Sequence, residues 1–115
     1  MAKVLIMLVR VLGLAAIVFG ALLWTGQRQY LGPHIGTGFG IATVVFVLAV
    51  VALTKKAVVP GILGVVLAVL LPVFGFMQLP LTFHTMRAIQ VVHIFLALAI
   101  IGVAERLHAA VHRAR

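Results

Sequence analysis

Four long apolar runs take up most of the chain, and they restrict its fold more than any other feature. The runs span residues 1–24, 35–54, 58–77 and 88–104. Each is close to the ~20 residues that an α-helix needs to cross a bilayer. Because lipid offers no hydrogen bonds to the backbone, such segments must be helical. We therefore predict an all-α, integral membrane four-helix bundle, and a chain that is 65% hydrophobic does not suit a water-soluble core.

The net charge of +8 comes from basic residues at the ends of the apolar runs. In a four-span arrangement one side holds Lys3, Arg10, Lys55, Lys56, Arg106, Arg113 and Arg115, and the other side holds Arg28 and Arg87. Cytoplasmic loops of membrane proteins carry the excess of lysine and arginine. The asymmetry predicts that both termini are cytoplasmic, in a multi-pass protein of a bacterial inner (plasma) membrane. This membrane orientation accounts for the positive net charge, so the charge is no argument for nucleic-acid binding.

Glycine, proline and lysine mark the ends of the predicted helices. Gly26 and Pro33 separate the first two apolar runs, Lys55 follows the second, and Pro60 can open the third helix. The predicted helices span about residues 3–25, 33–55, 59–78 and 82–112, in a single domain of residues 1–115. Loops this short favour an up-down-up-down order of the four helices.

His93 is the polar residue of the fourth run whose transfer into a membrane would cost the most free energy, because apolar side chains surround it in the sequence. An ionisable group within a span is by default a functional hypothesis. Gln90 lies one turn earlier on the same helix face, where it could orient the imidazole or a bound group. Two interpretations stay open. His93 ligates a cofactor, or it is a neutral histidine that bonds to a backbone carbonyl or a hydroxyl group of another helix.

Three histidines, His34, His84 and His93, fall in the outer half of the predicted bundle. Histidines that face each other in a bundle core are a common way to hold heme. Arg28 and Arg87 lie on the same side, where they could pair with heme propionates or simply extend to the membrane interface. The chain has no cysteine, which excludes thiolate ligands.

Residue spacing alone does not decide which histidines would share one metal. His84 and His93 are nine residues apart, so a regular helix turns them to opposite faces. His34 is 21 residues from Lys55, or ~31 Å of helix, whereas His93 is 13 residues from Arg106, or ~20 Å. By this measure His84 matches the depth of His34 better than His93 does. The pairing therefore stays open at this level.

Small residues recur at helical spacing in two of the predicted helices. They are Gly13, Ala16 and Gly20 in the first helix, and Gly64, Ala68 and Gly75 in the third. Such stripes allow close helix packing, or they leave room for a flat cofactor. Gly38 lies one turn after His34 on the same face of the second helix, which favours a group that approaches the backbone there.

Two further histidines, His108 and His112, lie with Glu105 on one face of the predicted C-terminal helix end. Their spacing of four residues could bind a metal, or a second heme shared with a partner subunit. The alternative is a solvated helix end whose cations interact with the C-terminal helix dipole. Both interpretations stay open.

Two segments resemble one four-helix half of the heme A synthase family. The stretch "PHIGTGFGIATVVFVLAVVALTKK" is similar to the second helix of such a half, with His34 in the place of a heme ligand. The stretch "AIQVVHIFLALAIIGVAE" is similar to the fourth, with His93 in the ligand place. The resemblance covers residues 31–105. Leu31 and Ile35 stand where the family has a glutamate and usually an arginine, and the chain corresponds to one half instead of two.

The resemblance implies heme b binding by His34 and His93, and the departures from the family pattern disfavour oxidation of a heme methyl group. His84 is the alternate ligand. We expect electron transfer by a non-enzymatic cytochrome b-like protein, with a quinol or a periplasmic redox protein as partner, alone or in a homo-oligomer. Gly38, Gln90, Arg28 and Arg87 complete the predicted cofactor site. One alternative is an accessory subunit of a larger membrane complex. The other is a small multidrug-type transporter, which the absence of a glutamate from the first helix disfavours.

Overall fold

The computed structural model describes residues 1–78 and 83–113, with the backbone alone for residues 83–86, and all four main elements are α-helices. They are α1 (Ala2–Trp24), α2 (Leu31–Thr54), α3 (Val58–Met77) and α4 (Phe83–Arg113), and a short 3₁₀ helix, η1 (Arg28–Tyr30), precedes α2. No strand occurs among these residues, so the all-α prediction is confirmed for them. All four α-helices are long and apolar enough to cross a membrane.

The predicted helix bounds agree with the structure to within one residue, except at the start of α2. We predicted that start at residue 33, which is wrong, because η1 leads directly into α2 at Leu31 and Pro33 becomes its third residue. Proline is tolerated there, since the first helical N–H groups have no partner within the helix. The predicted start of the last helix, residue 82, lies outside the described residues.

The helices α1 and α2 end in the same hydrogen-bonded motif, with a residue of positive φ just after the helix. After α1 this residue is Gly26 (φ 96°), and after α2 it is Lys56 (φ 64°). The Gln27 N–H bonds to the Leu22 carbonyl, and the Ala57 N–H bonds to the Ala52 carbonyl. These are the six-to-one bonds of the Schellman motif. Glycine adopts the required conformation freely, whereas Lys56 does so at some conformational cost.

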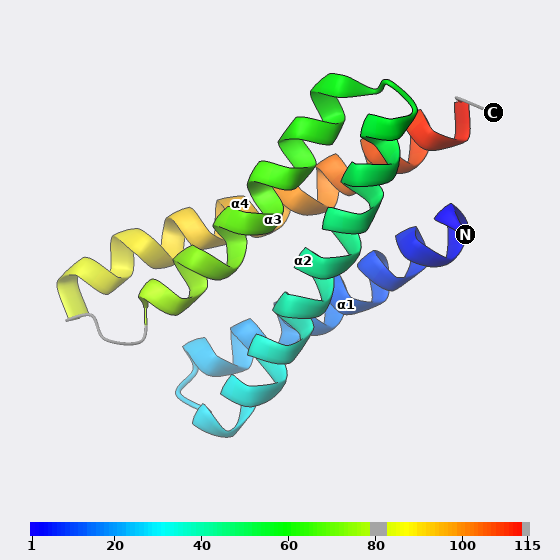
Figure 1. Ribbon diagram of the computed structural model, residues 1–115. Helices are drawn as coiled ribbons and strands as arrows, with labels where there is room; N and C mark the ends of the chain where they lie inside the picture. The colour runs from blue at the N-terminus through cyan, green and yellow to red at the C-terminus, as the bar shows by residue number, and fades with distance from the viewer. Residues whose placement is uncertain (79–82, 114–115) are drawn as a thin grey trace.

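Figure 1 shows both termini at one end of the molecule, together with the α2–α3 turn, whereas the α1–α2 connection lies at the other end. Successive helices pack against each other, and α4 also contacts both α1 and α2. Away from the termini, the α1–α2 pair and the α3–α4 pair diverge in this view. The helices thus form two hairpins that are joined most closely near the termini.

The buried core contains apolar side chains of all four helices. Its fully buried members include Val9, Val45, Leu48, Ile100 and Leu107. The helices α2 and α3 approach closely at Gly64, where an added Cβ would lie 2.8 Å from both the Ala49 Cβ and the Leu107 Cδ1. Gly64 therefore serves helix packing, which is one of the two interpretations of the small-residue stripe.

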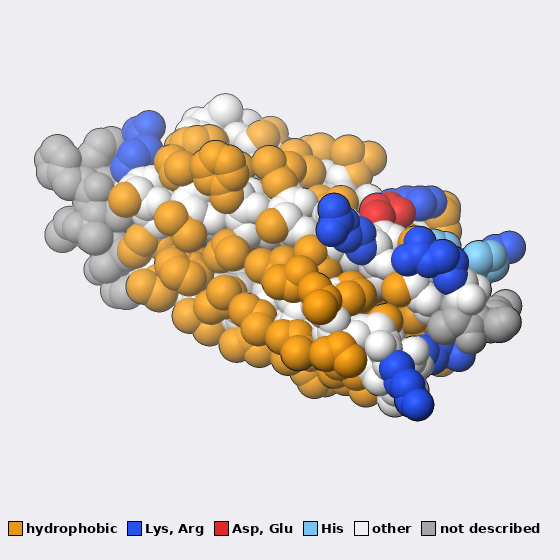
Figure 2. Space-filling model, turned by 90° about the horizontal axis from the view of Figure 1, so that it is seen from above, with side chains coloured by type: hydrophobic (Ala, Val, Ile, Leu, Met, Phe, Trp, Pro, Cys, Tyr) orange, Lys and Arg blue, Asp and Glu red, His pale blue; other side chains and the backbone are white. Residues whose placement is uncertain are grey.

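Outside this core, the molecule presents apolar side chains along its length. Figure 2 shows them over most of the visible face, with basic side chains gathered mainly toward one end. That end also carries Glu105, the chain's one acidic residue. The two Glu105 oxygens accept hydrogen bonds from Arg10 Nε at 2.8 Å and an Arg10 terminal nitrogen at 3.0 Å. This two-bond ion pair connects α1 to α4.

We expect Glu105→Gln and Arg10→Gln each to lower the thermal unfolding midpoint of the detergent-solubilised protein. Each single change leaves the partner charge without its counterion, so the double variant should lose less stability than the two single losses combined. Lys3→Gln is the matched control, because no ion pair of Lys3 occurs among the described residues. If the stability loss of the double variant equals the sum of the two single losses, the ion pair does not stabilise the contact between α1 and α4.

Candidate cofactor site

A cavity of about 460 Å³ lies among the four α-helices, and residues of all four line it. This volume is within the usual range for small-molecule and cofactor sites. The part of its wall that described residues form is mainly apolar, with the polar side chains of His34, Gln78, Gln90 and His93. A few polar groups in an apolar cavity are typical of sites that orient one bound molecule.

His34 lies in the first turns of α2, and its ring is held by α1. Its Nδ1 is 3.0 Å from the carbonyl oxygen of Ala16. Because a carbonyl oxygen only accepts hydrogen bonds, Nδ1 must carry a proton, and in a neutral ring Nε2 then has a free lone pair. Gly20, one turn after Ala16, makes this approach possible, since a Cβ there would lie 3.1 Å from the His34 Cε1.

His93 lies on α4 and packs against α3 in a corresponding way. A Cβ added to Gly75 would lie 3.3 Å from the His93 Cε1. The backbone of Leu71, one turn before Gly75, is close enough to interact with the ring. Yet Nδ1 of His93 is buried without a hydrogen bond of good geometry to any described residue. Such a buried polar atom is unusual in a folded protein and calls for an explanation.

The two histidine rings lie close together in the cavity wall. Their centres are 6.2 Å apart, and their planes are inclined by 75°. An imidazole nitrogen binds a metal at about 2 Å and the ring centre lies roughly 1 Å behind it, so two rings on opposite sides of one metal have centres about 6 Å apart. The observed separation would therefore allow both histidines to bind one metal.

The other predicted site residues lie at different places relative to this cavity. Gly38 and Gln90 line it, and a Cβ on Gly38 would meet nothing within 4 Å. The Arg87 guanidinium lies 6.0 Å from the centre of the Trp24 ring, and Trp24 itself lines the cavity. Arg28 is exposed on η1 and does not line it. The side chain of His84 lies outside the described residues.

Some features of the site were not assigned from the sequence. Gly20 and Gly75 belong to the small-residue stripes, but nothing in the sequence pairs them with His34 and His93. The Ala16 carbonyl has no sequence signal, because every residue has one. Gln78 was missed altogether. It lies just after α3, lines the cavity, and donates a hydrogen bond from Nε2 to the Phe74 carbonyl oxygen at 3.3 Å.

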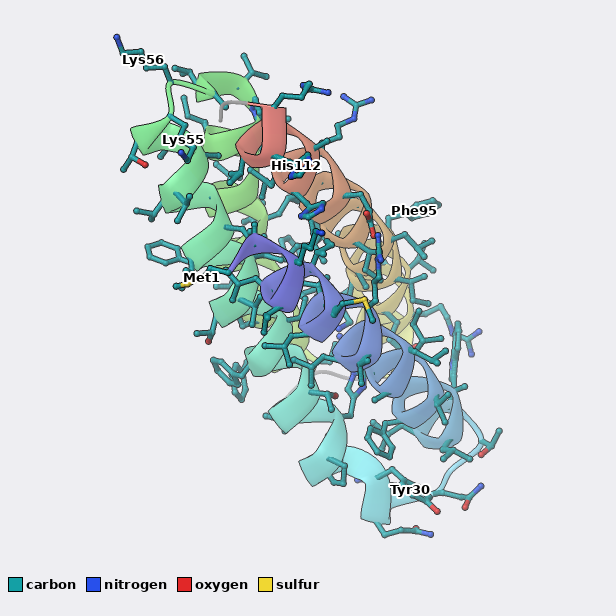
Figure 3. The ribbon with its side chains drawn as sticks, turned by 90° about the vertical axis from the view of Figure 1, so that its right-hand side faces the viewer. Met1, Tyr30, Lys55, Lys56, Phe95 and His112 are labelled. Carbon is teal, nitrogen blue, oxygen red and sulfur yellow. The ribbon has the colours of Figure 1, made fainter. Side chains whose placement is uncertain are left out.

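The histidines of the C-terminal helix end are separate from this site. Figure 3 shows His112 at the end that carries Lys55 and Lys56, opposite Tyr30. The rings of His108 and His112 stack with centres 6.1 Å apart. No cluster of three or more metal-binding side chains occurs among residues 1–78 and 87–113. The two interpretations of this helix end, a metal or heme site and a solvated end, both stay open.

Comparisons of the chain with protein-family models, with curated proteins and with solved structures each found no match.

Proposed function

We propose that this protein is a membrane cytochrome b-like protein that holds one heme b between His34 and His93 and transfers electrons. The observation that carries the proposal is the close pair of imidazoles, with ring centres 6.2 Å apart, in a cavity with a mainly apolar wall. The two ligands come from α2 and α4, which contact each other across the bundle. His84 remains the alternate ligand.

The backbone contacts of the two rings support this ligand role. A metal-bound histidine usually donates its other N–H to a backbone carbonyl or carboxylate, which sets the tautomer and makes the ligating nitrogen more basic. His34 has this arrangement through Ala16. For His93 the corresponding acceptor would be the Leu71 carbonyl. Leu71 lies one turn before Gly75, and Ala16 lies one turn before Gly20 in the same way. In this proposal the two hairpins would support their ligands in the same way.

The cavity wall supports the choice of a flat, largely apolar cofactor. Gly20, Gly75 and Gly38 present no side chain toward the site, and most of the other lining residues are apolar, with Ile and Leu the commonest. Heme with two histidine ligands undergoes one-electron oxidation and reduction and keeps no open coordination position for oxygen. The chain's own residues would hold it, orient it and exclude water, so we propose electron transfer and no enzymatic chemistry on the heme.

In the membrane, we propose an up-down-up-down order with both termini in the cytoplasm of a bacterium and the heme toward the outer side. Seven of the nine basic residues then lie on the cytoplasmic side. Arg28 and Arg87 lie at the outer end, where they would pair with the heme propionates. The contact of Arg87 with Trp24 would place its guanidinium near the cavity. A quinol or a periplasmic redox protein would exchange electrons with the heme.

The accessory-subunit alternative has one observation in its favour, because the hydrogen bond from His34 to Ala16 could serve helix packing alone. It offers no reason for the mainly apolar cavity that both histidines line. The transporter alternative has less support, since Glu105 is bonded to Arg10 and does not line the cavity.

The test is the absorption spectrum of the detergent-purified full chain, as isolated and after addition of hemin. We expect one heme per chain and sharp α and β bands on reduction with dithionite, as in low-spin heme with two histidine ligands. Carbon monoxide should leave the reduced spectrum unchanged, because both axial positions are filled. A protein that stays colourless with hemin would overturn the proposal in favour of the accessory subunit. A rapid reaction with carbon monoxide would overturn the two-histidine ligation.

A further inference from the structure

A second cavity, of about 370 Å³, lies between the start of α3 and the end of α4. Val59, Pro60, Leu63 and Val103 contribute apolar side chains to its wall. Its charged wall residues are Arg106 and Arg113, which are seven residues apart and therefore share one face of α4. The cavity thus combines an apolar wall with two cationic groups.

The two arginines have no counterion within the described part of the chain. The only ion pair found there joins Arg10 to Glu105, so the neighbouring carboxylate is already engaged. Neither Arg106 nor Arg113 makes a hydrogen bond to another described residue. Guanidinium groups bind phosphate and carboxylate oxygens through paired, charge-assisted hydrogen bonds. Both groups are therefore available to an external anion.

The start of α3 adds to the positive potential of this cavity. Its N-cap residue is Ala57, which makes no side-chain capping bond, and its first turn contains no acidic residue. The first N–H groups of a helix have no partner within the helix and carry a partial positive charge. Val59, in this first turn, also lines the cavity. The two arginines and the helix start therefore favour the same sign of ligand charge.

We propose that this cavity binds an anionic phospholipid, with the phosphate group at Arg106 and Arg113 and an acyl chain along the apolar wall. The site lies at the end of the molecule where most basic side chains gather (Figure 2). Basic pockets between helices at the membrane surface match lipid phosphates, and the apolar wall matches a hydrocarbon chain. Free phosphate would satisfy the arginines only. This inference is independent of heme binding.

The test is native mass spectrometry of the delipidated full chain in a nonionic detergent, titrated with phosphatidylglycerol or phosphatidylcholine. We expect preferential binding of phosphatidylglycerol, and Arg106→Gln/Arg113→Gln should weaken that binding roughly tenfold. Lys55→Gln/Lys56→Gln is the matched control, because it removes two charges at the same end from residues that do not line the cavity. This control should retain the preference for phosphatidylglycerol.

Three results would overturn the proposal. Equal losses in the two double variants would show general attraction to the basic end. Equal binding of the two lipids by the unchanged protein would show that charge does not select the ligand. Competition by inorganic phosphate at millimolar concentration would show a simple anion site. If the double glutamine variant does not fold, Leu63→Trp serves in its place, because it fills the apolar part of the cavity and should exclude the acyl chain while both arginines remain.

Discussion

Replacing His93 with alanine is expected to abolish the low-spin heme spectrum of the hemin-loaded protein. His93 faces His34 at a ring-centre distance of 6.2 Å, and no other described histidine lines the cavity. Of the described histidines only His34 would remain to bind the iron, so the sharp reduced α and β bands should disappear, with either loss of heme or a high-spin spectrum. The measurement is the dithionite-reduced absorption spectrum of wild type and variant at equal protein concentration.

The matched control for this prediction is His108→Ala, which removes a histidine from the same helix but outside the cavity. Its spectrum should equal that of the wild type. His34→Ala should behave like His93→Ala, and retention of the low-spin bands in His34→Ala would identify His84 as the second ligand. Retention of the full spectrum in His93→Ala would contradict the proposed ligation altogether. Circular dichroism should show unchanged helicity in all three variants.

Replacing Gly64 with alanine is expected to destabilise the helix bundle by about 1–3 kcal/mol. The added Cβ would lie 2.8 Å from the Ala49 Cβ, which belongs to a side chain without rotatable bonds, so α2 and α3 must separate to admit it. The same Cβ would crowd Leu107 on α4. Overpacking of this kind should exceed the gain of roughly 0.5–1 kcal/mol that alanine brings to a helix interior.

The control for Gly64 is Gly102→Ala, because an added Cβ at Gly102 would meet nothing within 4 Å. Gly102→Ala should therefore leave the stability unchanged or raise it slightly, whereas Gly64→Ala should lower it. The measurement for both variants is the free energy of unfolding in detergent micelles with increasing denaturant, with helix loss followed by circular dichroism. If Gly64→Ala proved as stable as Gly102→Ala, the close approach of α2 and α3 would not be a strong constraint.

The helices themselves were predictable from the chain alone. An apolar run of about 20 residues in lipid has one way to satisfy its backbone, so run length translates directly into helix length. The bounds of α1 and α3 agree with the prediction to within one residue. The start of α2 was missed because Gly32 and Pro33 signal a break, whereas a 3₁₀ turn extends the helix before them.

The histidine pair shows what spacing does not decide. Residue counts measure distance along one helix, and they favoured His84 over His93 as the neighbour of His34. The arrangement of the helices in space decides which positions on α2 and α4 face each other, and it brings His34 and His93 together. Axial ligation by this pair is still a prediction, but its two side chains are neighbours in the fold.

The sequence by itself determined which segments form helices and which residues they carry. It predicted four apolar helices, basic residues concentrated at one end, and histidines within otherwise apolar segments. The tertiary structure decided the use of each small residue. Gly64 packs α3 against α2, whereas Gly20 and Gly75 make room for the imidazoles of His34 and His93. The reason is physical, since a glycine looks the same in every stripe and only the neighbouring helix determines what occupies the space that it leaves.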